Sequence, residues 1–266
     1  MRWRASTILA LGFACWAATA SAGESAPSLT VAGTEFRLTL PDGRVLRSAE
    51  LRGAILKIGN DGAAVTQVRI DAVEPDPTDK SAEVLLHTLS VYDEAASQWV
   101  PLCEVDPNGN RFGFPYPLDA AGQQFALTCT AGAEGKCIRM GYRPWKTAPD
   151  GTPLHDHFRA CIHMLRADYC GDNRPATRDG TTVDIYDRLD LQDPTPDPAF
   201  HFEAAWGVDG AVCVAHTRLP DLLTLDELHR RCPRIAPAPT GSRCTYEAMR
   251  NDPRALIFNS SKIPAQ

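Results

Sequence analysis

Eight cysteines follow an N-terminal segment with the features of an export signal, and this combination limits the possible folds more than any other feature of the chain. Arg2 and Arg4 precede an uncharged apolar run over residues 8–18 and the small residues Ala20-Ser21-Ala22. This order is typical of a secretory signal peptide over residues 1–22. We expect cleavage after the small residues, following Ala22. The apolar run is shorter than the about 20 residues that a membrane-spanning helix needs, so we expect an exported chain without a transmembrane anchor, in the periplasm or the medium.

A ninth cysteine, Cys15, belongs to the signal segment, so an even number follows it. An even number of cysteines in an exported chain predicts disulfide bonds. No CxxC motif occurs, and the spacings match no zinc pattern, so we expect neither a metal nor a cofactor. The residues expected to be oxidised are Cys103, Cys129, Cys137, Cys161, Cys170, Cys213, Cys232 and Cys244.

The pairing of these cysteines is limited only in part. If residues 156–169 form a helix, Cys161 and Cys170 lie about 13 Å apart along its axis. A disulfide needs Cα atoms within about 7 Å, so these two should bond to other partners. Cys129 with Cys137, across a glycine-rich turn, and Cys232 with Cys244 are candidates for local pairs.

The charge of the chain excludes one class of partner. Residues 1–22 contain two of the 27 Lys and Arg residues and none of the 33 Asp and Glu residues, so the remainder carries a net charge of −8. An acidic chain of this kind does not bind nucleic acid through a basic surface.

The first hundred residues after the signal segment read as β structure. Apolar residues alternate over residues 30–40, and Asp42-Gly43 then predicts a hairpin turn. Further strands are expected at 54–58 and 64–73, on either side of Asn60-Asp61-Gly62, and at 83–92. We expect a sandwich or small barrel of about six antiparallel strands.

The pattern changes after Cys129. Residues 154–169 are expected to form an amphipathic helix on which Phe158, Cys161, Ile162, Leu165 and Tyr169 share one face. Asp156 is the expected N-cap, and Gly171 the residue that ends the helix.

Two strands, at 200–206 and 211–217, and a capping box at Thr224-Leu225-Asp226-Glu227 follow. The expected fold class is α+β: a β-rich sandwich or small barrel at 23–128 is packed on a mixed, disulfide-braced part at 129–266 with one main amphipathic helix.

Several motifs together resemble the bacterial ADYC-domain family, an exported family without an assigned activity. The resemblance rests first on the Ala167-Asp168-Tyr169-Cys170 run. Other motifs that carry it are Trp99-Val100-Pro101-Leu102-Cys103, Gly141-Tyr142-Arg143-Pro144-Trp145, Thr177-Arg178-Asp179-Gly180-Thr181 and Phe202-Glu203-Ala204-Ala205-Trp206. It extends from about residue 95 to the C-terminus and continues more weakly through the β-rich front. It implies membership of the family but no substrate.

Asp168 is the most informative acidic residue. A carboxylate in the last turn of a helix faces the negative end of the helix dipole, so a cation should offset it, and Arg143 or Arg166 is the expected partner. We favour a structural role in which Asp168 anchors the turn that leads to Asp172. The alternative is a catalytic or ligand-binding carboxylate.

Two further groups of residues are candidates for sites. His155-Asp156-His157 resembles a metal site, but its two histidines straddle the start of a helix, so a solvated helix end is the better interpretation. Tyr142, Arg143 and Trp145 combine aromatic and guanidinium groups as sugar-binding surfaces do, with Arg166 as a fourth candidate. The alternative is that the aromatic rings are buried beneath a turn.

Two hypotheses about function remain. The first, which we favour, is a non-catalytic module that binds a glycan, a peptide or another cell-envelope component. The second is a secreted hydrolase in which Asp168 or Asp172 acts as acid or base with a histidine, His155 or His216. GxSxG, HExxH, P-loop and dinucleotide-binding motifs are all absent from the chain.

Overall fold

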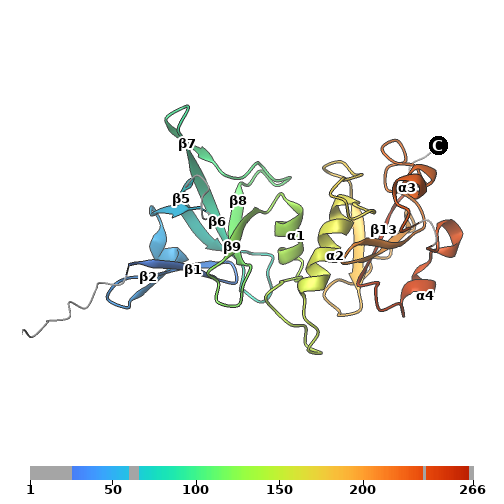
Figure 1. The fold of residues 1–266 in the computed structure, drawn as a ribbon, viewed down its shortest axis with the longest axis horizontal. Helices are drawn as coiled ribbons and strands as arrows, with labels where there is room; N and C mark the ends of the chain where they lie inside the picture. Colours follow the sequence, from blue (N-terminus) through green and yellow to red (C-terminus); the bar gives the residue numbers. More distant parts are fainter. Residues whose placement is uncertain (1–25, 60–65, 236–237, 264–266) are drawn as a thin grey trace, which may run out of the picture.

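The computed structural model describes residues 26–59, 66–235 and 238–263. The expected signal peptide and the Asn60-Asp61-Gly62 turn lie outside these residues. Figure 1 shows the β-rich N-terminal part, called the front below, at the left. Helices α1 and α2 lie in the middle, and a second sheet with α3 and α4 lies at the right.

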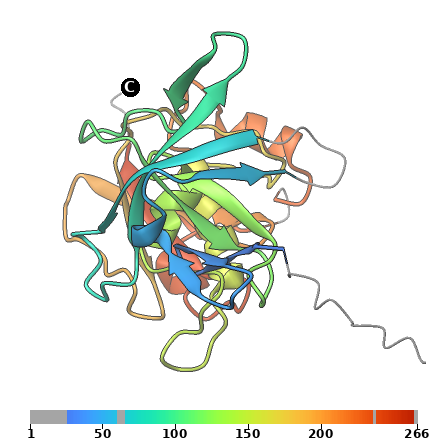
Figure 2. The same ribbon diagram turned by 90° about the vertical axis from the view of Figure 1, so that its left-hand side faces the viewer.

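The front contains two antiparallel sheets (Figures 1 and 2). One has the order β1-β2-β3, with β1 (Ser28–Ala32), β2 (Glu35–Thr39) and β3 (Val45–Arg47); a short 3-10 helix, η1 (Ser48–Leu51), follows it. The other has the order β4-β5-β6-β8-β9, and β7 also pairs with β6. Its strands are β4 (Ile55–Ile58), β5 (Thr66–Pro75), β6 (Leu85–Asp93), β7 (Gln98–Pro101), β8 (Phe112–Pro117) and β9 (Phe125–Cys129).

The two front sheets share a core, because alternate strand residues point inward. Val31 and Phe36 from the small sheet pack with Val68, Ile70 and Leu89 from the large one. The front thus has more strands than the sequence suggested. The stretch over residues 30–40 is not one strand, because Gly33, at φ +60°, makes a turn between β1 and β2.

The remainder of the chain carries the helices and the second sheet. The helices are α1 (Ala133–Arg139), α2 (His155–Arg166), α3 (Leu225–Arg231), η2 (Gly241–Arg243) and α4 (Tyr246–Met249). The sheet has the order β10-β13-β11-β12, with β10 (Val183–Asp187), β11 (Phe200–Gly207), β12 (Gly210–Val214) and β13 (Ile257–Lys262). The expected α+β, disulfide-braced fold class is confirmed, and so is the capping box at Thr224 and Glu227.

Helix α2 is shorter than predicted. It ends at Arg166, and Ala167 at φ 48° is its left-handed C-cap. Asp168 therefore lies just beyond the helix rather than in its last turn. Asp156 is not the N-cap: that position belongs to Leu154, which makes no side-chain capping bond.

The buried face of α2 is also rotated from the predicted one. Met164 is fully buried and His157 is 5% exposed, whereas Ile162 and Leu165 are only partly buried. The reason is that α2 packs against β11, β12 and β13 as well as α1. These neighbours cover the flank of α2 that carries His157 and Met164, which the hydrophobic pattern placed outside the buried face.

All eight cysteines form disulfides, as expected. The pairs are Cys103–Cys129, Cys137–Cys161, Cys170–Cys232 and Cys213–Cys244. The expectation that Cys161 and Cys170 do not pair is confirmed, but the two local pairs are wrong. Cys129 at the end of β9 bonds to Cys103, which follows β7, and Cys170 and Cys232 join the turn after α2 to the end of α3.

Candidate functional site

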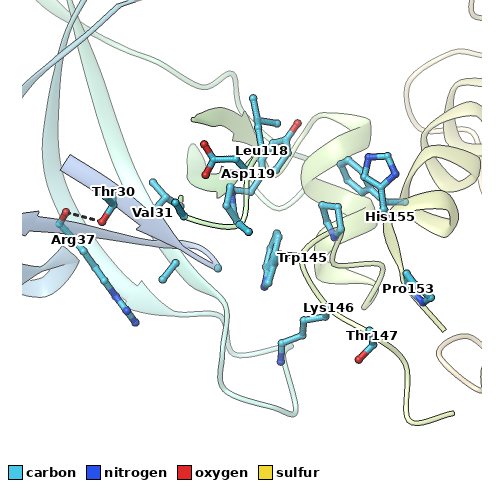
Figure 3. Close-up of a pocket in the computed structure, with 18 residues that line it drawn as sticks. Thr30, Val31, Arg37, Leu118, Asp119, Trp145, Lys146, Thr147, Pro153 and His155 are labelled. Atoms are coloured by element: carbon cyan, nitrogen blue, oxygen red, sulfur yellow. Dashed lines mark hydrogen bonds between the residues drawn. The ribbon is translucent and has the colours of Figure 1, made fainter. Parts of the chain in front are cut away.

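A cavity of about 810 Å³ opens between the front sheets and the start of α2. Its walls come from the β1–β2 hairpin, the turn after β8 and the segment that leads into α2 (Figure 3). The volume lies in the range of about 300–1,000 Å³ that is usual for small-molecule sites.

Trp145 is the central aromatic residue of this cavity. Its half-buried ring stands between the β1–β2 strands on one side and Pro153 and His155 on the other (Figure 3). The turn at Gly33 lies beside the indole: a Cβ atom at this position would be in van der Waals contact with Nε1, at 3.6 Å. The hairpin therefore holds one edge of the indole and shapes the cavity around it.

Two other aromatic rings lie among the lining residues and stabilise this side of the cavity. Tyr116 from β8 and Phe158 from α2 are each 6% exposed, and their ring centroids lie 5.7 Å apart in an edge-to-face arrangement. Such aromatic pairs contribute about 0.5–1.5 kcal/mol beyond area burial. Tyr116 and Phe158 join the large front sheet to α2, so this wall of the cavity is well packed.

The charged lining residues are two cations, Arg37 and Lys146, and one carboxylate, Asp119, with the imidazole of His155 beside them. Arg37 donates to Glu35 at 3.0 Å, Lys146 pairs with Glu83, and His155 is exposed. Asp119 also lines the cavity, but its oxygens accept the backbone N–H groups of the turn at residues 123 and 124, at 3.1 and 2.9 Å. Hydrogen-bond donors thus surround an aromatic surface, which is the combination that sugar hydroxyls and peptide carbonyls require.

The four predicted binding residues do not form one site. Trp145 lines the cavity just described, and Arg166 lines a different one. Tyr142 is fully buried and donates to Asp187 at 2.6 Å. The ring of Tyr142 is therefore buried, whereas the ring of Trp145 is accessible from the cavity.

Arg143 is buried in an ion-pair cluster. It is 6% exposed and donates to Asp79 at 2.7 Å and to Glu83. Burial raises the pKa of the Asp79 carboxyl, but hydrogen bonds from Ser81, Val84 N–H and Arg143 outweigh burial and hold that pKa well below its ordinary value. Arg143 therefore connects the loop between β5 and β6 to the segment after α1.

Asp168 is 1% exposed, and its ion-pair partner among the described residues is His163 rather than an arginine. Oδ1 accepts Asp172 N–H at 3.1 Å, and Oδ2 accepts Asn173 N–H at 3.0 Å and lies 3.1 Å from His163 Nδ1. Both expected arginine partners are wrong, because Arg143 pairs with Asp79 and Glu83, and Arg166 donates to the carbonyl of Asn173. Backbone N–H groups replace the cation, since the chain turns back over the carboxylate after α2.

The other catalytic candidates do not converge on Asp168. Asp172 pairs with Arg231 at 2.9 Å, and His155 lies beside Asp156. The His216 ring nitrogens lie 3.3 and 3.4 Å from backbone carbonyls. The histidine within hydrogen-bond distance of Asp168 is His163, which the sequence analysis did not select. Neither His163 nor Asp168 lines any of the four cavities described for this chain.

A buried polar network also escaped the sequence analysis. Glu203 on β11 is fully buried, and both its oxygens accept from Arg218, at 3.0 and 3.1 Å. Tyr169 donates to the same carboxylate at 2.9 Å, and Asn259 donates to it at 2.8 Å. A glutamate inside the apolar strand sequence Phe202-Glu203-Ala204-Ala205-Trp206 was the available signal, because a lone buried carboxylate needs partners.

This network stabilises the structure around α2. Burial raises the pKa of the Glu203 carboxyl, but the charge and hydrogen bonds of Arg218 outweigh it and leave the pKa below its ordinary value. Arg218 also donates to the carbonyls of Met164 and Leu165, which end α2. Tyr169, the tyrosine of the Ala167-Asp168-Tyr169-Cys170 run, is therefore part of this buried hydrogen-bond network.

Within the described residues, no group of three or more His, Cys, Asp or Glu side chains is arranged to hold a metal ion. His155 is exposed and His157 is buried, both in the first turn of α2. In the same part of the chain, no helix is long and apolar enough to cross a membrane.

The fold and its cysteine pairs define a disulfide-braced α+β protein. The chain belongs to the ADYC domain family, whose model matches residues 48–220. This match includes the whole of the large front sheet as well as α1, α2 and strands β10 to β12. Comparisons with curated proteins and with solved structures find no match.

Proposed function

We propose that this protein is an exported, non-catalytic binding module whose ligand site is the Trp145 cavity. The observation that carries the proposal is the half-buried indole of Trp145 in a cavity of about 810 Å³ with cationic and hydroxyl groups around it. A glycan is the ligand class that fits best, because a sugar ring presents C–H groups to an aromatic face and hydroxyls to surrounding donors. The donors available here are Arg37, Lys146 and His155.

Export is supported by the four disulfides, because such bonds persist in oxidising compartments. Disulfides also favour a preformed site, since they limit the movement of the segments that they join. Cys137–Cys161 ties α1 to α2, and the Trp145 segment lies between these two helices. A preformed site loses less conformational entropy when it binds a ligand.

The hydrolase hypothesis has less support. Its acid or base would be Asp168, but this carboxylate is 1% exposed and both its oxygens accept hydrogen bonds from the chain. A general acid must reach the substrate atom that it protonates. Asp172 is more accessible, yet it pairs with Arg231 and has no histidine partner in the described part of the chain.

Trp145→Ala should abolish or strongly weaken glycan binding. Fragments of peptidoglycan and of surface polysaccharides, printed as an array, provide the first screen. Binding constants for any hit are then measured by titration of intrinsic fluorescence. Loss of an aromatic stacking residue at the centre of a site should weaken binding at least about tenfold.

Trp99→Ala is the matched control. Trp99 lies on β7, packs beside Tyr92 and Arg69, and does not line the cavity. This variant should bind the same glycan as the unmodified protein does. Equal losses in the two variants, or glycan binding that survives Trp145→Ala, would contradict the proposed site.

A further inference from the structure

A second cavity, of about 510 Å³, lies beside the C-terminal half of α2 and shares no lining residue with the Trp145 cavity, which lies at the start of that helix. Its walls come from α1, α2 and the segment that leads into β10. Ile162, Leu165 and Val183 form its apolar surface. Ile162 and Leu165 are the two residues of the amphipathic face that were predicted to be buried, and they remain partly exposed because they face this cavity.

Two cations of this cavity have no carboxylate partner in the described part of the chain. Arg166 at the end of α2 makes one hydrogen bond, from Nη2 to the Asn173 carbonyl at 3.1 Å. Lys136 on α1 is likewise outside every ion pair of these residues. Both side chains are partly buried, so their charges are less screened than those of fully exposed residues.

Arg218 adds a buried cation to the wall. It is 2% exposed, and four hydrogen bonds engage its guanidinium: two to Glu203, one to Leu165 O and one to Met164 O. A guanidinium has five N–H groups, so one N–H of Nη1 is left over. A ligand anion can accept this hydrogen bond without disturbing the network.

The cavity also contains two acidic side chains, and they restrict its ligand. Glu134 is partly buried and Asp179 is exposed. Neither takes part in an ion pair within 4 Å among the described residues, so each adds a negative charge to the lining. These carboxylates repel a second negative group on a ligand. The lining thus suits one anionic group and an apolar remainder.

We propose that this cavity binds a small monocarboxylate with an apolar body. The carboxylate contacts Arg166, Lys136 and the remaining N–H of Arg218. The hydrocarbon part packs on Ile162, Leu165 and Val183. This site is separate from the glycan site, and neither depends on the other.

The test uses octanoate as the probe and measures its binding to the purified protein by calorimetry. Octanol has the same chain without the charge, and octanedioate adds a second carboxylate. Both should bind at least about tenfold more weakly than octanoate, which corresponds to about 1.4 kcal/mol. Inorganic sulfate should not compete at a comparable concentration, because it has no apolar part.

Variants assign the binding to this cavity. Arg166→Gln and Lys136→Gln should each weaken octanoate binding at least about tenfold. Arg159→Gln is the control: Arg159 lies on the same helix but faces Asp209 and does not line the cavity. Thermal melts establish that each variant is folded, and Lys136→Gln serves as the test if Arg166→Gln is unfolded.

Several results would overturn the proposal. These are equal binding of octanoate and octanol, equal binding of octanedioate, competition by sulfate, or unchanged affinity in Lys136→Gln. Loss of octanoate binding in Trp145→Ala would also overturn it, because the probe would then occupy the other cavity. Failure of the glycan screen alone leaves this site unaffected.

Discussion

Asp168 illustrates how a residue can be correctly singled out and still have the wrong partners. Its expected anchoring of the following turn agrees with the hydrogen bonds from Asp172 and Asn173. The expected arginine is absent from its surroundings, because backbone N–H groups and His163 satisfy the carboxylate instead. A hydrogen bond formed by chain reversal leaves no periodic trace in a sequence, whereas a salt bridge at helical spacing does.

Asp168→Asn should lower the free energy of unfolding by about 1–3 kcal/mol. The amide replaces one acceptor oxygen by an NH₂ group, which faces donors and leaves buried groups unsatisfied. Denaturant unfolding measures the loss. Asp172→Asn is the control on the same turn; its ion pair with Arg231 is partly exposed, so the change should cost less than about 1 kcal/mol. Similar losses in both variants would argue against the anchoring role.

His87 makes stability depend on pH. It is fully buried on β6, with Nε2 2.8 Å from Ser48 Oγ, and burial lowers its pKa from 6.5 to about 4. The unfolded chain therefore takes up a proton below pH 6.5 that the folded protein refuses until about pH 4. The stabilisation from neutral His87 is complete above the unfolded pKa and is lost as the pH falls toward the folded one.

His87→Gln removes this titration but keeps a polar side chain near Ser48. Between pH 7 and pH 4, the unmodified protein should lose about 3 kcal/mol more stability than the variant. Below about pH 4 the difference should stop growing. Urea unfolding at several pH values measures both curves, and parallel curves would show that His87 does not titrate in this way.

At the scale of elements, α2 shows what an amphipathic pattern can and cannot specify. Phe158 and Cys161 are buried as the pattern predicted, but Met164 and His157 are buried as well. The three strands of the second sheet that pack on the helix come from residues 200–262, far away in the sequence. A helix covered from two sides buries a wider arc than its hydrophobic stripe indicates.

Met164→Ala should therefore destabilise the protein more than Leu165→Ala. Met164 is fully buried, so its truncation should cost about 2–5 kcal/mol. Leu165 is partly exposed to a cavity, and less apolar surface is lost there. Thermal and denaturant unfolding of the two variants give the comparison. An equal or reversed order would mean that the described face of α2 is not the packed one.

For the molecule as a whole, one hydrophobic cluster spans the proposed boundary between residues 128 and 129. Leu86 and Phe114 from the front strands belong to the same cluster as Ile138, Phe158 and Met164. The Arg143 ion pairs with Asp79 and Glu83 join the same two parts. The two regions thus differ in secondary structure but share a core.

Unfolding should accordingly occur in a single transition. Far-ultraviolet circular dichroism reports mainly the secondary structure, and tryptophan fluorescence reports Trp99 in the front, Trp145 in the segment before α2 and Trp206 in the second sheet. Both signals should give the same denaturation midpoint under non-reducing conditions. Two separated midpoints would indicate that the parts before and after residue 128 fold as independent domains.

The sequence by itself determined the properties that depend on local pattern and composition. These are the α+β class, the disulfide-braced build, the capping box at Thr224 and the amphipathic character of α2. Only the tertiary structure decided the cysteine partners, the burial of Glu203 with Arg218, and the separation of Trp145 from Tyr142. The physical reason is that disulfides, buried ion pairs and cavities join segments far apart in the chain, and their positions follow from packing rather than from the local sequence.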